Sequence, residues 1–206
     1  MTTTGQTAER APLRHRVVAE VAPHAVAITV VAALGVAAAL WYTGPSWTAP
    51  AAATFAVTGA ALAVIDLRTH RLPDALVLPS YPLAGVVLAV ASIGTEDPAA
   101  YGRAVAGCVL LLVAYAGLKL AHPAGLGLGD VKLAGVLGAY LGWAGWDALA
   151  VGACAAFVAG GLVSVVLLVT RRATRTTALP FGPFMILGAV LGIAGGERTV
   201  AVLLGG

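Results

Sequence analysis

The chain has 206 residues, of which 60% are hydrophobic and only 10% are charged, and its mean hydropathy is +0.94. Soluble domains carry about 25% charged residues, so this composition excludes an ordinary soluble protein. The formal charge of +3 comes from scattered arginines and lysines, and the absence of a long basic tract argues against a nucleic-acid partner.

Seven apolar runs follow one another along the chain, separated by short polar segments. Each run approaches the ~20 residues that a helix needs to cross a bilayer. We therefore predict an all-α, polytopic membrane bundle with about six or seven transmembrane helices. The predicted spans are residues 25–42, 51–67, 75–93, 104–120, 131–146, 148–170 and 184–196. The last run is the shortest, and the sequence leaves open whether it spans completely.

Two regions are expected: a polar, basic N-terminal arm over residues 1–23 and a membrane-embedded domain over residues 24–206. The first apolar run ends in Trp41 and Tyr42 and is not closed by a convincing small-residue cleavage site, which favours a retained span over a cleaved signal. Cys108 and Cys154 lie inside apolar runs without a CxxC pair, so we interpret them as core residues. No metal or cofactor is expected.

The orientation of the bundle is predicted from its basic residues. With a cytosolic N-terminus, two basic residues, Arg103 and Arg198, lie outside. The cytosolic side then receives the other ten, which are Arg10, Arg14, Arg16, Arg68, Arg71, Lys119, Lys132, Arg171, Arg172 and Arg175. This distribution follows the positive-inside rule.

Glycines recur through the fifth predicted span at helical spacings. They are expected to line one face along which another helix approaches closely, and they are Gly135, Gly138, Gly142 and Gly145. In the preceding polar link between spans two and three, Pro73 is predicted to open the third helix, because its missing N–H would be unpaired there.

Two aspartates stand at the ends of predicted spans. Asp66 closes the second span and Asp130 opens the fifth, and the two crossings between them return the chain to the same face. Acids at the edge of an apolar segment are candidates for a functional site. Two carboxylates that share a proton can activate water and polarise a peptide carbonyl, as in aspartic proteolysis.

Two other classes of function compete with a protease. In a small proton-coupled transporter the two aspartates would carry protons, although such acids usually lie near the bilayer midplane and the chain shows no internal repeat. A structural scaffold would not need two acids at one membrane face. Three alternating glycines precede Asp130 in the stretch GLGLGD, where they would permit close backbone approach to an extended substrate. The alternative is that they form a flexible loop that leads into the fifth span.

Three segments resemble the signature regions of the type IV prepilin peptidases, a family of membrane aspartic proteases. They are DLRTHRLPDALVLP (66–79), GLGLGDVKLAGVLGAYLGW (125–143) and LPFGPFMILGAVLG (179–192), and they cover most of the chain after residue 60. The resemblance places the catalytic pair on Asp66 and Asp130, with the second acid ending the GxGD motif.

The resemblance also implies a substrate and a location. Members of the family cleave a short basic leader from prepilins or pseudopilins, just before a hydrophobic helix, at the cytosolic face of a prokaryotic inner membrane. Proteolysis needs no metal. The expected partners are therefore such a substrate and the lipid bilayer. Five further residues are expected to bind substrate or shape the site, namely Gly127, Gly129, Lys132, Pro73 and Asp74.

This chain departs from the family pattern in two ways. Position 74 is Asp where the family often has Asn, and Leu72 stands where Ile is common. Bifunctional members carry a Cys-rich zinc segment associated with N-methylation of the trimmed pilin, and the two cysteines here do not form one. The chain therefore resembles the short, peptidase-only branch that serves Tad-type pili, and no N-methyltransferase activity is expected.

Helix electrostatics predict how the pair divides its roles. Asp130 lies at the N-terminus of its span, where the helix dipole favours negative charge, and Asp66 lies at the C-terminus of its own, where the dipole opposes it. We expect the resting proton on Asp66 and the base that activates water to be Asp130.

Overall fold

The computed structural model describes residues 12–123, 125–171 and 179–204, with side chains through Gly196. The described residues contain helices and no strand. Most of the predicted N-terminal arm, together with Arg172 and Arg175, lies outside them. The helices are α2 (Leu13–Val21), the 3-10 helix η1 (Ala22–His24), α3 (Ala25–Thr43), α4 (Ala49–Thr69), α5 (Asp74–Gly94), α6 (Pro98–Ala121), α7 (Leu128–Ala144), α8 (Trp146–Val169) and α9 (Gly182–Leu204).

Each of the seven predicted spans falls on one of the helices α3 to α9, although several boundaries differ. The last helix continues to Leu204 rather than ending at residue 196. Trp146 belongs to α8 and not to the fifth span, because Gly145 breaks the chain with a φ of 149°. Pro73 is the extended residue that precedes α5, so Asp74 and not the proline opens that helix.

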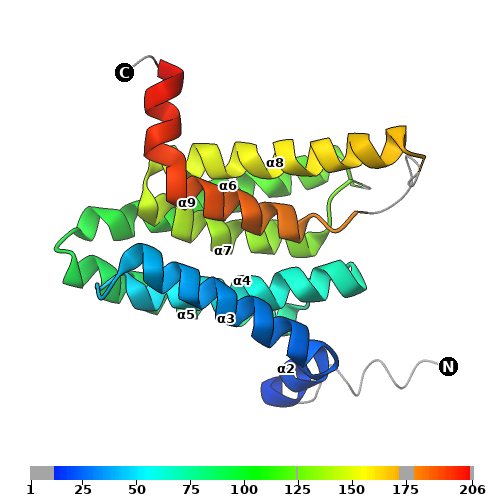
Figure 1. Cartoon of the computed structure of the whole chain (residues 1–206), viewed down its shortest axis with the longest axis horizontal. Coiled ribbons are helices and arrows are strands. Elements are labelled where there is room, and N and C mark those ends of the chain that lie inside the picture. Colours follow the sequence, from blue (N-terminus) through cyan, green and yellow to red (C-terminus); the bar gives the residue numbers. More distant parts are fainter. Residues whose placement is uncertain (1–11, 124, 172–178, 205–206) are drawn as a thin grey trace.

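The helices form two layers that run along the same long axis (Figure 1). One layer holds α3, α4 and α5, and the other holds α6, α7, α8 and α9. Within the layers α8 packs along α9, α6 along α7, and α3 along α4. Helix α7 also contacts α5, α8 and α9, and eleven of its 17 residues are buried. The helix that carries Asp130 is thus the centre of the bundle.

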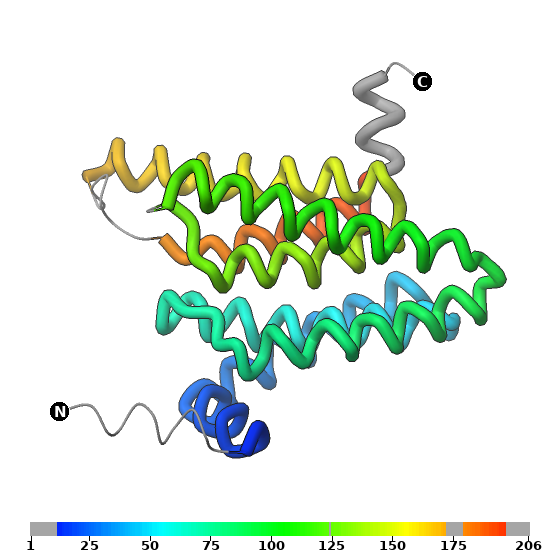
Figure 2. The backbone as a smooth tube through the Cα atoms, turned by 180° about the vertical axis from the view of Figure 1, so that it is seen from behind, coloured from blue at the N-terminus to red at the C-terminus, as the bar shows by residue number. Residues whose placement is uncertain are grey.

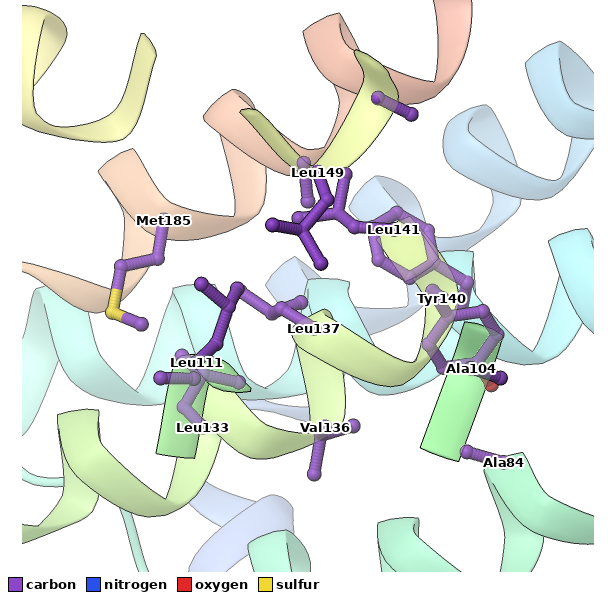
Figure 3. Close-up of a cluster of buried hydrophobic side chains, with 14 of the residues drawn as sticks. Ala84, Ala104, Leu111, Leu133, Val136, Leu137, Tyr140, Leu141, Leu149 and Met185 are labelled. Atoms are coloured by element: carbon purple, nitrogen blue, oxygen red, sulfur yellow. The ribbon is translucent and has the colours of Figure 1, made fainter. Parts of the chain in front are cut away.

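Leucines from α6 and α7 form much of the core, with Leu149 of α8 and Met185 of α9 packed on them (Figure 3). Across the two layers, the rings of Phe55 in α4 and Tyr140 in α7 meet edge to face with centroids 5.1 Å apart. The core therefore ties α7 to both layers.

Four glycines were predicted to line a close contact between helices, and two of them, Gly138 and Gly142, lie in such a contact. A Cβ at Gly138 would collide with the carbonyl oxygen of Gly107, and one at Gly142 with that of Arg103, so α6 and α7 meet backbone to backbone. Gly135 faces the hydroxyl of Tyr81 on α5 instead. The expectation for Gly145 was wrong, because that residue lies between α7 and α8, where a Cβ would meet nothing within 4 Å.

The outer helices expose large apolar side chains along their length. Examples are Val26 and Leu34 on α3, and Val158 and Leu162 on α8. Among the described residues, five helical segments are long and apolar enough to cross a membrane, and they are Leu13–Thr43, Ala49–Thr69, Asp74–Gly94, Pro98–Ala121 and Trp146–Val169. The exposed apolar surface suits hydrocarbon rather than water, so the chain is a polytopic helical membrane protein.

Candidate active site

The two aspartates lie at the same end of the bundle. Asp66 is in the last turn of α4 and Asp130 in the first turn of α7. The α4–α5 link, the segment before α7 and the start of α9 meet at this end, at the right in Figure 1 and at the left in the reverse view of Figure 2. Leu72 of the α4–α5 link packs against Gly129, the neighbour of Asp130, and against Gly182, whose N–H binds Asp66. The predicted pair is therefore brought together.

Asp130 is held by the residue that caps its own helix. Its Oδ2 accepts a hydrogen bond of 2.9 Å from the backbone N–H of Gly127, the residue that precedes α7. This is the reach-back half of a capping box, in which an acid in the first turn pairs with an otherwise orphan N–H. A Cβ on Gly127 would lie 2.9 Å from the same Oδ2, so glycine leaves room for the acid. Asp130 is only 8% exposed.

Asp66 is held by a different helix. Its Oδ2 accepts a hydrogen bond of 3.0 Å from the backbone N–H of Gly182, which is 116 residues away in sequence and is the first residue of α9. Asp66 is 4% exposed, and a buried carboxylate requires hydrogen-bond donors. Helix α9 therefore supplies part of the environment of the first acid.

Leu72 connects the surroundings of the two acids. It lies in the link between α4 and α5, and its Cβ is 2.7 Å from where a Cβ on Gly129 would stand. Its Cδ1 is 3.5 Å from the corresponding position on Gly182. Gly129 is therefore required for close approach of α7 to this link, as glycine beside a packed backbone often is.

Asp74 and Lys132 pair with each other. The Nζ of Lys132 lies 2.6 Å from Oδ1 and 2.8 Å from Oδ2 of Asp74, and the two side chains are 35% and 46% exposed. The hydroxyl of Tyr81 donates to the carbonyl oxygen of Lys132 at 2.6 Å. Both contacts join the start of α7 to α5. Pro73 immediately precedes this start of α5, so all five site-shaping residues predicted from the sequence lie at the end that holds the two acids.

Two residues beside the acids were missed by the sequence prediction. Lys119, in the last turn of α6, donates to the carbonyl oxygens of Pro123 and Leu126, the latter at 2.6 Å, and so holds the segment that leads to the GxGD motif. Gly182 is the other. Its signal was present in the stretch PFGPF, where a glycine stands between prolines at the start of an apolar run.

The arrangement can perform acid–base chemistry on water. Two buried carboxylates that interact and each accept one backbone N–H can hold one proton between them. The ionised member can then take a proton from water while the protonated member donates a hydrogen bond to an acceptor. In the part of the chain that the structure describes, no three His, Cys, Asp or Glu side chains gather as a metal site.

Comparison with known proteins identifies the family of the chain. A model of the type IV leader peptidase family matches residues 53–193, which include both acids and Gly182. The chain belongs to the type IV leader peptidase family. Its family is therefore one of peptidases, and the resemblance carried by the three signature segments is confirmed.

Several relatives bear the name prepilin leader peptidase/N-methyltransferase. The protein of Stutzerimonas stutzeri is 32% identical over 165 residues, covering 80% of this chain and 56% of the relative. That of Pseudomonas putida is 36% identical, covering 68% and 48%, and that of Escherichia coli is 39% identical, covering 64% and 57%. The chain thus spans about half the length of these relatives. No solved structure gives a significant match.

Proposed function

We propose that this chain is a membrane-embedded aspartic endopeptidase that removes the basic leader from type IV prepilins or pseudopilins. The observation that carries the proposal is the pair of buried carboxylates, Asp66 and Asp130, at one end of a helical membrane bundle of this family. Each acid accepts one backbone N–H from a glycine. The site lies at the cytosolic face of a prokaryotic inner membrane, as the excess of basic residues at that end supports.

In the proposed reaction one aspartate is ionised and the other protonated. The ionised acid takes a proton from a water molecule as the water oxygen attacks the scissile carbonyl carbon, and the protonated acid donates a hydrogen bond to the carbonyl oxygen while keeping its proton. The proton gained by the base then passes to the leaving nitrogen as the C–N bond breaks. The reaction consumes one water and one peptide bond and leaves both acids as they began.

The surrounding residues shape the site. Gly127 and Gly129 give the first turn of α7 room beside Asp130 and Leu72. Asp74 and Lys132, paired after Pro73, fix the start of α5 against α7. Asp74 is partly exposed, so a basic residue of the leader can reach its carboxylate beside Lys132.

The test is to reconstitute the purified chain in liposomes with a candidate prepilin and to determine the N-terminus of the product by mass spectrometry. We expect the wild type to release the leader, and Asp66→Asn and Asp130→Asn to release none, because Asn cannot exchange the proton. The control Asp147→Asn changes an exposed acid in the first turn of α8, at the opposite end, and should cleave like the wild type. Full cleavage by either Asn variant of the pair would rule out the two-aspartate mechanism.

We further propose that the chain alone leaves the new N-terminus unmethylated. Cys108 lies in α6 and Cys154 in α8, so neither stands in a loop that holds zinc. The same mass spectra, recorded with S-adenosylmethionine present, should show a free amine. A product heavier by one methyl group would contradict this part of the proposal.

A further inference from the structure

The backbone N–H of Gly182 binds the carboxylate of Asp66, although the two residues belong to different helices. Asp66 belongs to α4, whereas the N–H that binds its carboxylate belongs to the first residue of α9. Among the residues that the structure describes, this N–H is the hydrogen-bond donor to the Asp66 carboxylate. We propose that Gly182 is a positioning residue, which fixes the Asp66 carboxyl group relative to Asp130; this inference rests on the proposed function.

The location of Gly182 at the start of a helix makes its N–H available. The first N–H groups of a helix have no partner within it. The carbonyl oxygen of Phe181 accepts from Phe184 and Met185, both at 3.1 Å, so the first turn closes just beyond Gly182 and leaves its N–H directed at Asp66. An N–H at this position also favours negative charge on the acid that it binds.

Glycine at position 182 leaves room for the carboxyl group of Asp66. A Cβ there would lie 2.8 Å from Oδ2 and 3.4 Å from Cγ of Asp66. Its next neighbour, Cδ1 of Leu72, is at an ordinary contact distance of 3.5 Å. Gly188 and Gly192 of the same helix differ, because a Cβ on either would strike the backbone of α8. Those two glycines serve helix packing, whereas the space at Gly182 is occupied by the acid.

Aromatic packing fixes where α9 begins. A Cβ on Gly160 of α8 would lie 2.9 Å from the ring of Phe181, so this ring sits directly on the backbone of α8. The Phe181 ring also contacts the rings of Phe157 and Tyr115, with centroids 5.4 and 6.4 Å away. The residue before Gly182 is thus anchored to α8 and α6, and the donor is held in place independently of Asp66.

The first test detects the hydrogen bond without altering Gly182. Phe–Gly occurs once in the sequence, at residues 181 and 182, so a sample with carbonyl-¹³C Phe and ¹⁵N Gly gives a single cross-peak in an HNCO spectrum. We expect that amide proton to be shifted downfield by the carboxylate and to move upfield in Asp66→Ala. The control Asp147→Ala should leave it in place. A peak that does not respond to Asp66→Ala overturns the proposal.

The second test measures catalysis by Gly182→Ala on the prepilin substrate. Because the added methyl displaces the acid and not the substrate, we expect kcat to fall on the order of 10- to 100-fold while KM stays within about twofold. The matched control is Gly161→Ala in α8, where a Cβ meets nothing within 4 Å. An unchanged kcat, or a loss confined to KM, overturns the positioning role.

The outcomes separate this inference from the proposed function. If the wild type cleaves, Asp66→Asn does not, and Gly182→Ala cleaves normally, then the positioning role fails while the peptidase stands. If the wild type does not cleave prepilins, the proposed function fails, whereas the cross-peak still shows whether Gly182 binds Asp66.

Discussion

Asp66 lies at the C-terminal end of α4 and Asp130 at the N-terminal end of α7, but each carboxylate accepts one hydrogen bond from a backbone N–H. Asp130 lies in the first turn of α7, where the helix dipole favours its negative charge by roughly 0.3 to 1 kcal/mol. Asp66 lies in the last turn of α4, where the helix dipole disfavours its negative charge. The hydrogen bond from the N–H of Gly182 at the start of α9 favours that charge and partly offsets the dipole. The ammonium group of Lys119 donates a hydrogen bond to the carbonyl oxygen of Leu126, just before the GxGD motif, and so adds positive charge near Asp130.

These contributions lead us to predict that the resting enzyme carries its proton mainly on Asp66. Isotope-edited infrared difference spectroscopy with labelled aspartate should show a protonated carboxyl band in the wild type. The band should disappear in Asp66→Asn and persist in Asp130→Asn, although removing one acid also changes the charge felt by the other. A band that Asp130→Asn removes and Asp66→Asn retains would reverse the assignment of acid and base.

At the scale of elements, the tight pairing of α6 with α7 sets the position of the second acid. Gly107 and Gly138 meet with no side chain between the helices. Small residues allow this approach, and packing rather than water exclusion drives helix association within a bilayer.

We predict that Gly138→Ala destabilises the protein by about 1 to 3 kcal/mol, as overpacking of a tight interior does. Thermal unfolding in detergent should show a lower Tm. The control Gly117→Ala adds its methyl to an exposed site of α6 with nothing within 4 Å, and should be neutral or slightly stabilising. Equal Tm values for the two variants would show that α6 and α7 are not packed through glycine.

The helices could be predicted from the sequence more completely than the contacts between them. Apolar runs identified α3 to α9 because a span in hydrocarbon must satisfy its backbone within one helix. The spacing of Gly138 and Gly142 likewise indicated a close face. The bonds from Gly182 to Asp66 and from Lys132 to Asp74 join residues 116 and 58 positions apart, and no local pattern encodes such pairs. Gly145 was misassigned because helical spacing does not reveal a positive φ.

At the scale of the whole molecule, charge separates the two ends of the bundle. In the described ranges, Arg103 stands near the start of α6 at the end opposite the site, where it pairs with Asp97 at 3.1 Å. Of the other basic residues whose side chains the structure describes, five lie at or next to helix ends on the site side, and they are Arg68, Arg71, Lys119, Lys132 and Arg171. Arg14 and Arg16 lie in α2, which contacts α4 and α5.

We predict from this asymmetry that the site end faces the cytosol. In a variant that lacks Cys108 and Cys154, cysteines that replace Arg71 and Gly125 should be labelled only by thiol reagents that reach the cytosol. Cysteines that replace Thr95 and Asp147 should react from outside. All four positions are exposed. Labelling of positions 71 and 125 from opposite sides would separate the two acids and is incompatible with the site.

The most direct measurement of the central claim compares kcat/KM for Asp66→Asn, Asp130→Asn and the double variant on one prepilin substrate. Groups that act as one unit are not additive, so each single substitution should lose as much activity as both together. General acid–base catalysis sets the expected loss at about 10² to 10⁴-fold or more. Losses that multiply in the double variant, or a single variant that keeps the wild-type rate, would contradict a shared two-aspartate site.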